Sequence, residues 1–161
     1  VTFPLDEETK KLIDDSLTYL EMSQIEEYSE KYDLRPGMGL SFVQIGILKR
    51  IFVVSEEIEE GKFNRYVVIN PKVVSQSAEM IYVGEGEGCL SVNRDVDGIV
   101  PRHARITVDA FDENGKEFTI RVREDMAVAF QHELDHLDGI LFVDKIDKKN
   151  PYKNSDIMRE I

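Results

Sequence analysis

The chain has 161 residues, of which 42% are hydrophobic, and its 20 basic and 32 acidic side chains give a net charge of −12. This length suits one domain with its own core, so we expect residues 1–161 to form a single domain. The negative charge repels phosphate groups, which argues against nucleic-acid binding and against anionic membranes. A membrane span would need about eighteen consecutive apolar residues, and no such run occurs. Because the single cysteine, Cys89, cannot form an internal disulfide, we expect a cytoplasmic protein.

The N-terminal part of the chain, residues 6–31, is charged and rich in helix-forming residues. Ile13, Leu17 and Leu20 recur at spacings of four and three, which places them on one face of a helix. This spacing predicts an amphipathic helix that packs on the core. Residues 34–39 contain a proline and two glycines and predict a loop after the helix.

The middle of the chain has the composition of strands. Short β-branched runs predict strands at residues 51–54, 66–69, 72–74 and 80–83. Apolar and polar side chains alternate in residues 104–111 and again in residues 117–122, on either side of the turn sequence Asn114-Gly115. This alternation around an Asn-Gly pair predicts a β-hairpin.

A second helix is predicted over residues 124–137. Its first half is apolar, it contains neither glycine nor proline, and Gly139 follows at a position typical of a helix C-cap. Strands that precede one buried helix indicate an α+β fold. We therefore predict mixed or antiparallel β-sheets around this central helix, with the amphipathic helix at the N-terminus.

The predicted central helix carries the sequence His132-Glu133-Leu134-Asp135-His136, an HExxH pattern. Residues i and i+4 of a helix share one face, so both imidazoles can reach a single metal ion. Glu133 stands beside them and could accept a proton from water. The alternative is a pair of histidines that only fill the core, but it would bury an unpaired carboxylate at considerable cost. The pattern therefore favours a metal site.

A catalytic metal site usually has a third protein ligand. The extended HExxHxxGxxH pattern places it six residues after the second histidine, and Phe142 at that position excludes that class. Glu160 is the downstream carboxylate that would define a zinc metallopeptidase. Cys89 is the other candidate, because a thiolate binds Zn²⁺ or Fe²⁺ strongly. Cys89 follows a glycine-rich run, residues 84–88, whose glycines let the backbone pass close to a metal or substrate.

Three segments of the sequence resemble the signature motifs of peptide deformylases. They are residues 37–44 (GMGLSFVQ), 87–91 (EGCLS) and 131–139 (QHELDHLDG), and the motifs are GxGLAAxQ, EGCLS and QHExDHLxG. The second and third match at every position, whereas the first has Ser41-Phe42 in place of two alanines. The resemblance covers most of the chain and is greatest to the subclass typical of Gram-positive bacteria.

The resemblance implies an enzyme that removes the N-formyl group from the N-terminal methionine of new polypeptides and releases formate. It assigns one divalent metal ion to Cys89, His132 and His136. In this family the ion is commonly Fe²⁺, which Zn²⁺ or Ni²⁺ can replace. Glu133 would act as general base toward water and then donate the proton to the leaving amine.

The resemblance also implies an oxyanion site formed by the side-chain amide of Gln44 and the backbone N–H of Leu90. Phe42 adds volume where the family has alanine, and this could displace Gln44. A second hypothesis is therefore a metal-binding relative without activity or with altered specificity, beside the metallopeptidase that uses Glu160.

The expected substrates are N-formyl-methionyl nascent peptides, bound by strand addition. The peptide backbone would pair with Met38-Gly39 on one side and with Glu87-Gly88 on the other. Met38, Val128 and the ring of His132 are candidates for an apolar pocket around the methionine side chain. Because the net charge is negative, any association with the ribosome is expected to be weak. Separately, we expect a monomer.

Overall fold

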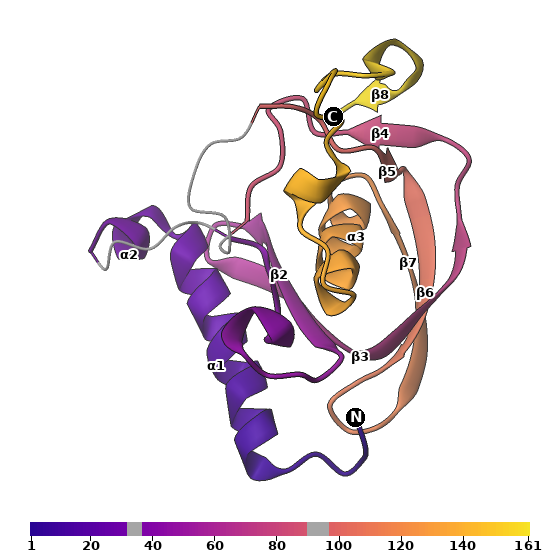
Figure 1. The fold of residues 1–161 in the computed structure, drawn as a ribbon. Helices are drawn as coiled ribbons and strands as arrows, with labels where there is room; N and C mark the ends of the chain where they lie inside the picture. Colours follow the sequence, from indigo (N-terminus) through magenta and orange to yellow (C-terminus); the bar gives the residue numbers. More distant parts are fainter. Residues whose placement is uncertain (32–36, 90–96) are drawn as a thin grey trace. The chain divides into compact units, whose positions relative to one another are not determined.

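The computed structural model describes residues 1–31, 37–89 and 97–161. The described chain is an α+β protein, as predicted (Figure 1). It divides into two compact units. The first contains Val1–Pro71 with Ala110–Phe118, and the second contains Lys72–Asp109 with Thr119–Ile161.

The helices are α1 (Glu7–Gln24), α2 (Glu26–Lys31) and α3 (Asp125–Leu137), with the 3-10 turns η1 (Phe42–Ile45), η2 (Phe142–Lys145) and η3 (Ser155–Ile157). The strands are β1 (Gly39–Ser41), β2 (Ile51–Glu59), β3 (Lys62–Gln76), β4 (Met80–Tyr82), β5 (Arg102–His103), β6 (Arg105–Phe111), β7 (Glu117–Arg123) and β8 (Arg159–Glu160). Hydrogen bonds order the strands β1-β2-β3 in the first unit and β3-β6-β7 in the second. A further sheet of the second unit has the order β5-β4-β8, in which β4 is antiparallel to β5 and parallel to β8.

Helix α1 begins after Asp6, whose carboxylate accepts a hydrogen bond of 2.7 Å from the backbone N–H of Thr9. Its apolar stripe is buried and packs beside β2, as the residue spacing predicts. The prediction of one helix up to residue 31 was wrong, because the helix is interrupted at Ile25. There the backbone is extended, and the N–H of Ile25 bonds to the carbonyl of Met22 before α2 begins.

The strands of the first unit differ from their predictions in two places. Gly39–Ser41 forms β1, although part of this segment was predicted to be a loop, because it pairs with the edge of β2 at Gly39↔Val54. The runs predicted as separate strands at 66–69 and 72–74 form one strand, β3. Proline at position 71 lacks an N–H, yet the strand continues through it.

The core of the first unit contains Phe42, the residue that departs from the family motif. Its side chain is fully buried, at the start of η1. It belongs to a cluster with Leu5, which precedes α1, and with residues of α1, β1, β2 and β3, namely Ile13, Leu17, Leu20, Leu40, Ile51, Val53 and Ile69. The larger ring is therefore accommodated by the packing of this unit.

The predicted hairpin and second helix are confirmed. At the hairpin turn, Asp112 accepts hydrogen bonds of 2.9 Å from the N–H groups of Asn114 and Lys116, and Gly115 has a φ of +79°. Helix α3 ends at Leu137. After it, Gly139 has a φ of +77°, and its N–H bonds to the carbonyl of His136. Strands β5 and β8 were not predicted, because each is only two residues long.

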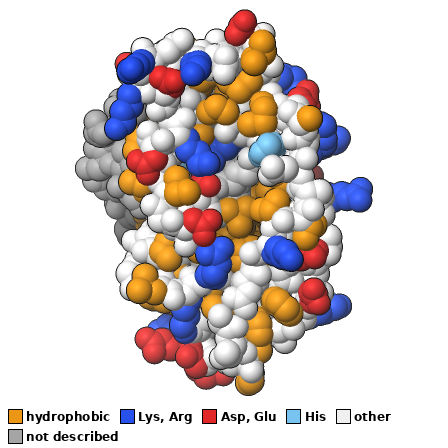
Figure 2. Space-filling model, turned by 45° about the vertical axis from the view of Figure 1, so that its right-hand side comes forward, with side chains coloured by type: hydrophobic (Ala, Val, Ile, Leu, Met, Phe, Trp, Pro, Cys, Tyr) orange, Lys and Arg blue, Asp and Glu red, His pale blue; other side chains and the backbone are white. Residues whose placement is uncertain are grey.

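None of the described helices is both long and apolar enough to cross a membrane. On the face drawn in Figure 2, basic and acidic side chains are interspersed with hydrophobic ones.

Candidate metal centre

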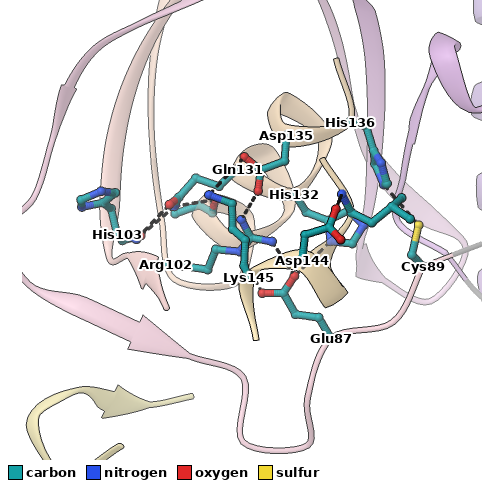
Figure 3. A network of polar contacts seen from close by, with 12 residues as sticks. Glu87, Cys89, Arg102, His103, Gln131, His132, Asp135, His136, Asp144 and Lys145 are labelled. Atoms are coloured by element: carbon teal, nitrogen blue, oxygen red, sulfur yellow. Dashed lines mark hydrogen bonds and ion pairs between the residues drawn. The ribbon is translucent and has the colours of Figure 1, made fainter. Parts of the chain in front are cut away.

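Three side chains of the second unit meet at one point: Cys89, His132 and His136. One ligand atom from each lies within 4.8 Å of the other two. The sulfur of Cys89 is 3.2 Å from Nε2 of His136, and the two imidazole rings meet edge to face with centroids 4.7 Å apart (Figure 3). Within residues 1–31, 37–89 and 97–161, no other group of histidine, cysteine and carboxylate side chains has this geometry.

Local structure explains how the donors meet. Helix α3 places His132 and His136 one turn apart on the same face. Cys89 follows β4 after a turn in which the N–H of Gly86 bonds to the carbonyl of Val83 at 2.9 Å. Gly86 has a φ of +85°, a conformation that favours glycine. The glycine-rich run thus brings the chain back toward α3.

Glu87 determines which nitrogen of His132 can bind a metal. Its Oε1 lies 3.0 Å from Nδ1 of His132. Because an ionised carboxylate only accepts hydrogen bonds, Nδ1 must carry the proton, and in a neutral ring Nε2 is left as the donor atom. A histidine ligand whose second nitrogen bonds to a carboxylate is the usual arrangement at metal sites.

Arg102 holds Glu87 in turn. Its Nε and Nη2 donate to the two carboxylate oxygens of Glu87 at 2.9 and 2.8 Å, and its Nη1 donates to Asp135 at 2.6 Å (Figure 3). The side chains of Arg102 and Glu87 are only 2% and 4% exposed. Burial raises the pKa of Glu87, but Arg102 and His132 outweigh it and lower the pKa below its usual value. Glu87 is therefore a buried carboxylate that stays ionised.

The surroundings of His132 favour positive charge. Burial lowers its pKa, but hydrogen bonds with Cys89 and Glu87 and the charge of Glu133 outweigh this and raise the pKa to about 10. The same negative charges and hydrogen-bond acceptors that favour a proton on His132 would also favour a metal cation nearby.

The donor set fits a divalent metal ion. One thiol and two imidazoles are ligands that both Zn²⁺ and Fe²⁺ accept, and three protein ligands leave a position for water or substrate. Cys89 and His136 are buried, the His132 side chain is 11% exposed, and the Nδ1 of His132 is oriented by a carboxylate.

Helix α3 is anchored by Gln131, whose role was not predicted. Its Oε1 accepts from the backbone N–H of His103 at 2.9 Å, and its Nε2 donates to the carbonyl of the same residue at 2.8 Å. Both bonds reach β5, the strand that also carries Arg102. The roles of Gln131 and Arg102 left little signal in the sequence, where Gln131 is one residue of a motif and Arg102 follows an apolar stretch.

Other predicted site residues of the second unit lie near these elements. Glu133 is on α3 with its side chain buried. Val128 is also on α3, in a hydrophobic cluster with Ile81 and Ala104. Among the described residues other than its chain neighbours, no atom lies within 4 Å of a Cβ placed on Gly88. Leu90, predicted to supply a backbone N–H, lies outside the described residues.

The remaining predicted residues belong to the first unit. The carbonyl of Met38 accepts from the N–H of Ser55 at 2.8 Å, and Gly39 begins β1. The side-chain oxygen of Gln44 accepts from the N–H of Ser41 at 2.8 Å. This bond fixes the orientation of the Gln44 amide group, with its nitrogen as the donor end.

Glu160, the alternative third ligand, lies on β8 of the second unit. Its carboxylate accepts a hydrogen bond of 3.4 Å from the hydroxyl of Tyr82. It is not a member of the group formed by Cys89 and the two histidines. The geometry thus favours Cys89 over Glu160 as third donor.

The chain is thus an α+β protein in which a helix with HExxH and a cysteine from another segment form a candidate metal site. A family model described as polypeptide deformylase matches residues 1–152, and the chain belongs to this family. It is 45% identical over 152 residues to the peptide deformylase of Oceanobacillus iheyensis, which covers 94% of this chain and 83% of that protein. It is 48% identical over 154 residues to the peptide deformylase of Shouchella clausii, covering 95% and 84%.

Solved structures agree with this assignment. A plant peptide deformylase, PDF1B, superposes with a TM-score of 0.74 at 30% identity, covering 89% of this chain and 70% of that one. The peptide deformylase of Thermus thermophilus superposes with a TM-score of 0.69 at 34% identity, covering 87% and 72%.

Proposed function

We propose that this protein is a metal-dependent peptide deformylase that hydrolyses the N-formyl group of N-terminal methionine in new polypeptides. The observation that carries the proposal is that the ligand atoms of Cys89, His132 and His136 lie close together. The helix and the segment that contain these residues bear the family motifs. The relatives that match most of the chain are peptide deformylases, which supports the same activity.

Cys89, His132 and His136 would hold the metal ion. When bound, the ion would polarise the formyl carbonyl and lower the pKa of water. Glu133 accepts the proton of the attacking water and then donates it to the leaving amine. Its buried position on α3, directly after His132 in the sequence, supports this role. The products are formate and a free N-terminal amine.

Gln44 and Leu90 are proposed to stabilise the negative charge that develops on the formyl oxygen. The bond between Ser41 N–H and the Gln44 oxygen supports this role, because the donor end of the amide is then defined. The burial of Phe42 in a packed cluster also supports it, since the departure from the family motif need not displace Gln44.

The substrate backbone is proposed to pair with Met38-Gly39 and with Glu87-Gly88. β1, which begins at Gly39, is the last strand at one edge of its sheet among the residues that the structure describes, and an edge strand can accept another strand. At Glu87-Gly88, the open space around Gly88 supports close approach of a peptide. Met38, Val128 and the ring of His132 are proposed to surround the methionine side chain.

Further features of the proposal concern the whole protein. We propose one divalent metal ion, Fe²⁺ as is common in this family, with Zn²⁺ or Ni²⁺ able to replace it. We also propose that the protein acts as a cytoplasmic monomer with at most weak ribosome association. Both units belong to one catalytic domain in which α3 is the central helix. Support comes from β3, β6 and β7, each of which has residues in both units.

The test is release of formate from formyl-Met-Ala-Ser by protein loaded with Fe²⁺ or Ni²⁺ without oxygen. We expect turnover, and we expect Glu133→Gln to lower kcat by about 10²- to 10⁴-fold while metal content is unchanged. Absence of turnover in fully loaded protein would instead support the inert or altered-specificity relative.

Two further variants distinguish the third ligand. We expect Cys89→Ala to lose bound metal and Glu160→Gln to retain it. The opposite pattern would identify a metallopeptidase site based on Glu160.

A further inference from the structure

Two segments of the second unit supply the metal donors, and one arginine joins them. Cys89 lies two residues after Glu87, and His136 lies directly after Asp135. Arg102, on β5, bonds to both carboxylates (Figure 3). The partners are 15 and 33 residues away from Arg102 in sequence, so these bonds connect parts of the chain that local structure does not bring together.

The bonds of Arg102 also fix the orientation of the carboxylate of Glu87. A guanidinium group is planar and presents its N–H groups in a fixed fork, so a two-bond contact sets the plane of the partner carboxylate. Here the fork binds both oxygens of Glu87, while the remaining arm reaches Asp135. With Arg102 only 2% exposed and Asp135 16% exposed, water competes little for these bonds.

The orientation of Glu87 is passed on to a metal donor. Its Oε1 lies 2.8 Å from Nη2 of Arg102 and 3.0 Å from Nδ1 of His132. The same oxygen thus connects the arginine to the imidazole. A rotation of the Glu87 carboxylate would break the bond to Nδ1 and free the ring of His132 to turn.

The segment before Cys89 has few side chains that could anchor it, because it is rich in glycine. Residues 84–88 include three glycines, and Gly86 adopts a left-handed conformation. Glycines contribute no side chain to hold a segment in place. Of the two other residues, Glu85 is exposed, whereas the Glu87 side chain is buried in its bonds to Arg102.

We propose that Arg102 is a positioning residue that pre-assembles the metal centre by joining Glu87 to Asp135. The inference rests on the proposed metal-dependent function. The bonds hold the segments that carry Cys89, His132 and His136, whose ligand atoms lie within 4.8 Å of one another. Because folding already orders the three donors, metal binding does not have to bear the entropic cost of ordering them. The affinity for the metal ion is therefore higher.

The experiment measures the affinity of the protein for Zn²⁺, without substrate, by competition with a chromophoric chelator. It also records the absorption spectrum of the Co²⁺-substituted protein. Substitutions around a metal site typically weaken binding 10- to 100-fold, and we expect Arg102→Gln to raise the Zn²⁺ dissociation constant within about that range. The Co²⁺ spectrum should change as well, since the donor geometry relaxes. Arg102→Lys retains the charge without the fork and should show a smaller, several-fold loss.

Arg159→Gln is the matched control, because Arg159 also bonds two carboxylates of this unit but is exposed. Its Zn²⁺ affinity should equal that of the unsubstituted protein. Circular dichroism and urea unfolding of the metal-free variants show whether each is folded. If Arg102→Gln does not fold, Arg102→Lys and Asp135→Asn decide the question, each with a several-fold loss of affinity expected.

The proposal is overturned if folded Arg102 variants bind Zn²⁺ within twofold of the unsubstituted protein with an unchanged Co²⁺ spectrum, whatever their stability. These readouts need no substrate. A protein that binds metal in this way but releases no formate would contradict the deformylase function and leave the inference intact.

Discussion

Two arginines of the second unit make nearly the same set of bonds in opposite surroundings. Arg102 bonds Glu87 and Asp135 at distances from 2.6 to 2.9 Å, with its side chain 2% exposed. Arg159 bonds Glu79 and Glu124 at distances from 2.6 to 3.3 Å, with its side chain 43% exposed. The number of bonds is therefore similar, and burial distinguishes the two.

This difference should decide what each arginine contributes. Around Arg159 the charges are hydrated with or without the bonds, so forming them gains little. Around Arg102 the carboxylates have exchanged water for the guanidinium, and its loss would remove the partner that binds both oxygens of Glu87 and one oxygen of Asp135. Burial lowers the pKa of Arg102, yet Glu87 and Asp135 outweigh it and raise the pKa above its usual value. The buried group thus depends on its partners far more than the exposed group does.

The largest effect is expected for Arg102→Gln in the metal-free protein. Removing one partner of a buried ion pair typically costs about 3–5 kcal/mol, and we expect a loss of this size in the free energy of unfolding. Urea unfolding followed by circular dichroism measures it. A loss below about 1 kcal/mol would show that the buried position of Arg102 confers no special dependence.

A smaller effect is expected for Arg102→Lys. Lysine retains the charge but cannot form the two parallel bonds to Glu87, and a lost hydrogen bond to a charged group is worth about 2 kcal/mol. The same unfolding measurement applies. If Lys and Gln variants were equally unstable, the fork geometry and not the charge would be the essential property.

Arg159→Gln should leave the urea midpoint within the error of the measurement at low salt. At about 1 M sodium chloride the Debye length falls to about 3 Å, so any residual difference from the unsubstituted protein should disappear. The Arg102→Gln difference should persist under the same conditions, because its partners are shielded from the solvent. A large, salt-resistant loss in Arg159→Gln would contradict the comparison.

The smallest effect concerns the pH dependence of the Arg159 group. Hydrogen bonds from Arg159 lower the pKa of Glu79 and of Glu124 below the value of 4.5. Their contribution to stability is therefore present above pH 4.5 and is lost as the pH falls through the lowered values. Any difference between Arg159→Gln and the unsubstituted protein should vanish in acid. A difference in stability that grows toward low pH would mean that the pKa values of Glu79 and Glu124 are not lowered.

Much of the local structure could be predicted from sequence. Alternation around Asn114-Gly115 predicted the hairpin, and the apolar run before His132 predicted α3, because both patterns depend on neighbouring residues. The break at Ile25 could not be predicted, since the residues on both sides favour helix. β1 and β8 could not be predicted either, because each exists only by pairing with a distant strand.

The sequence by itself determined the chemistry of the donors: a cysteine after glycines, and two histidines one helical turn apart with Glu133 between them. Only the tertiary structure decided that Arg102 connects Glu87 to Asp135, and that Glu87 orients His132. The physical reason is the range of each signal. Helical spacing is repeated within a few residues, whereas the burial of a charge depends on partners that folding brings from elsewhere in the chain.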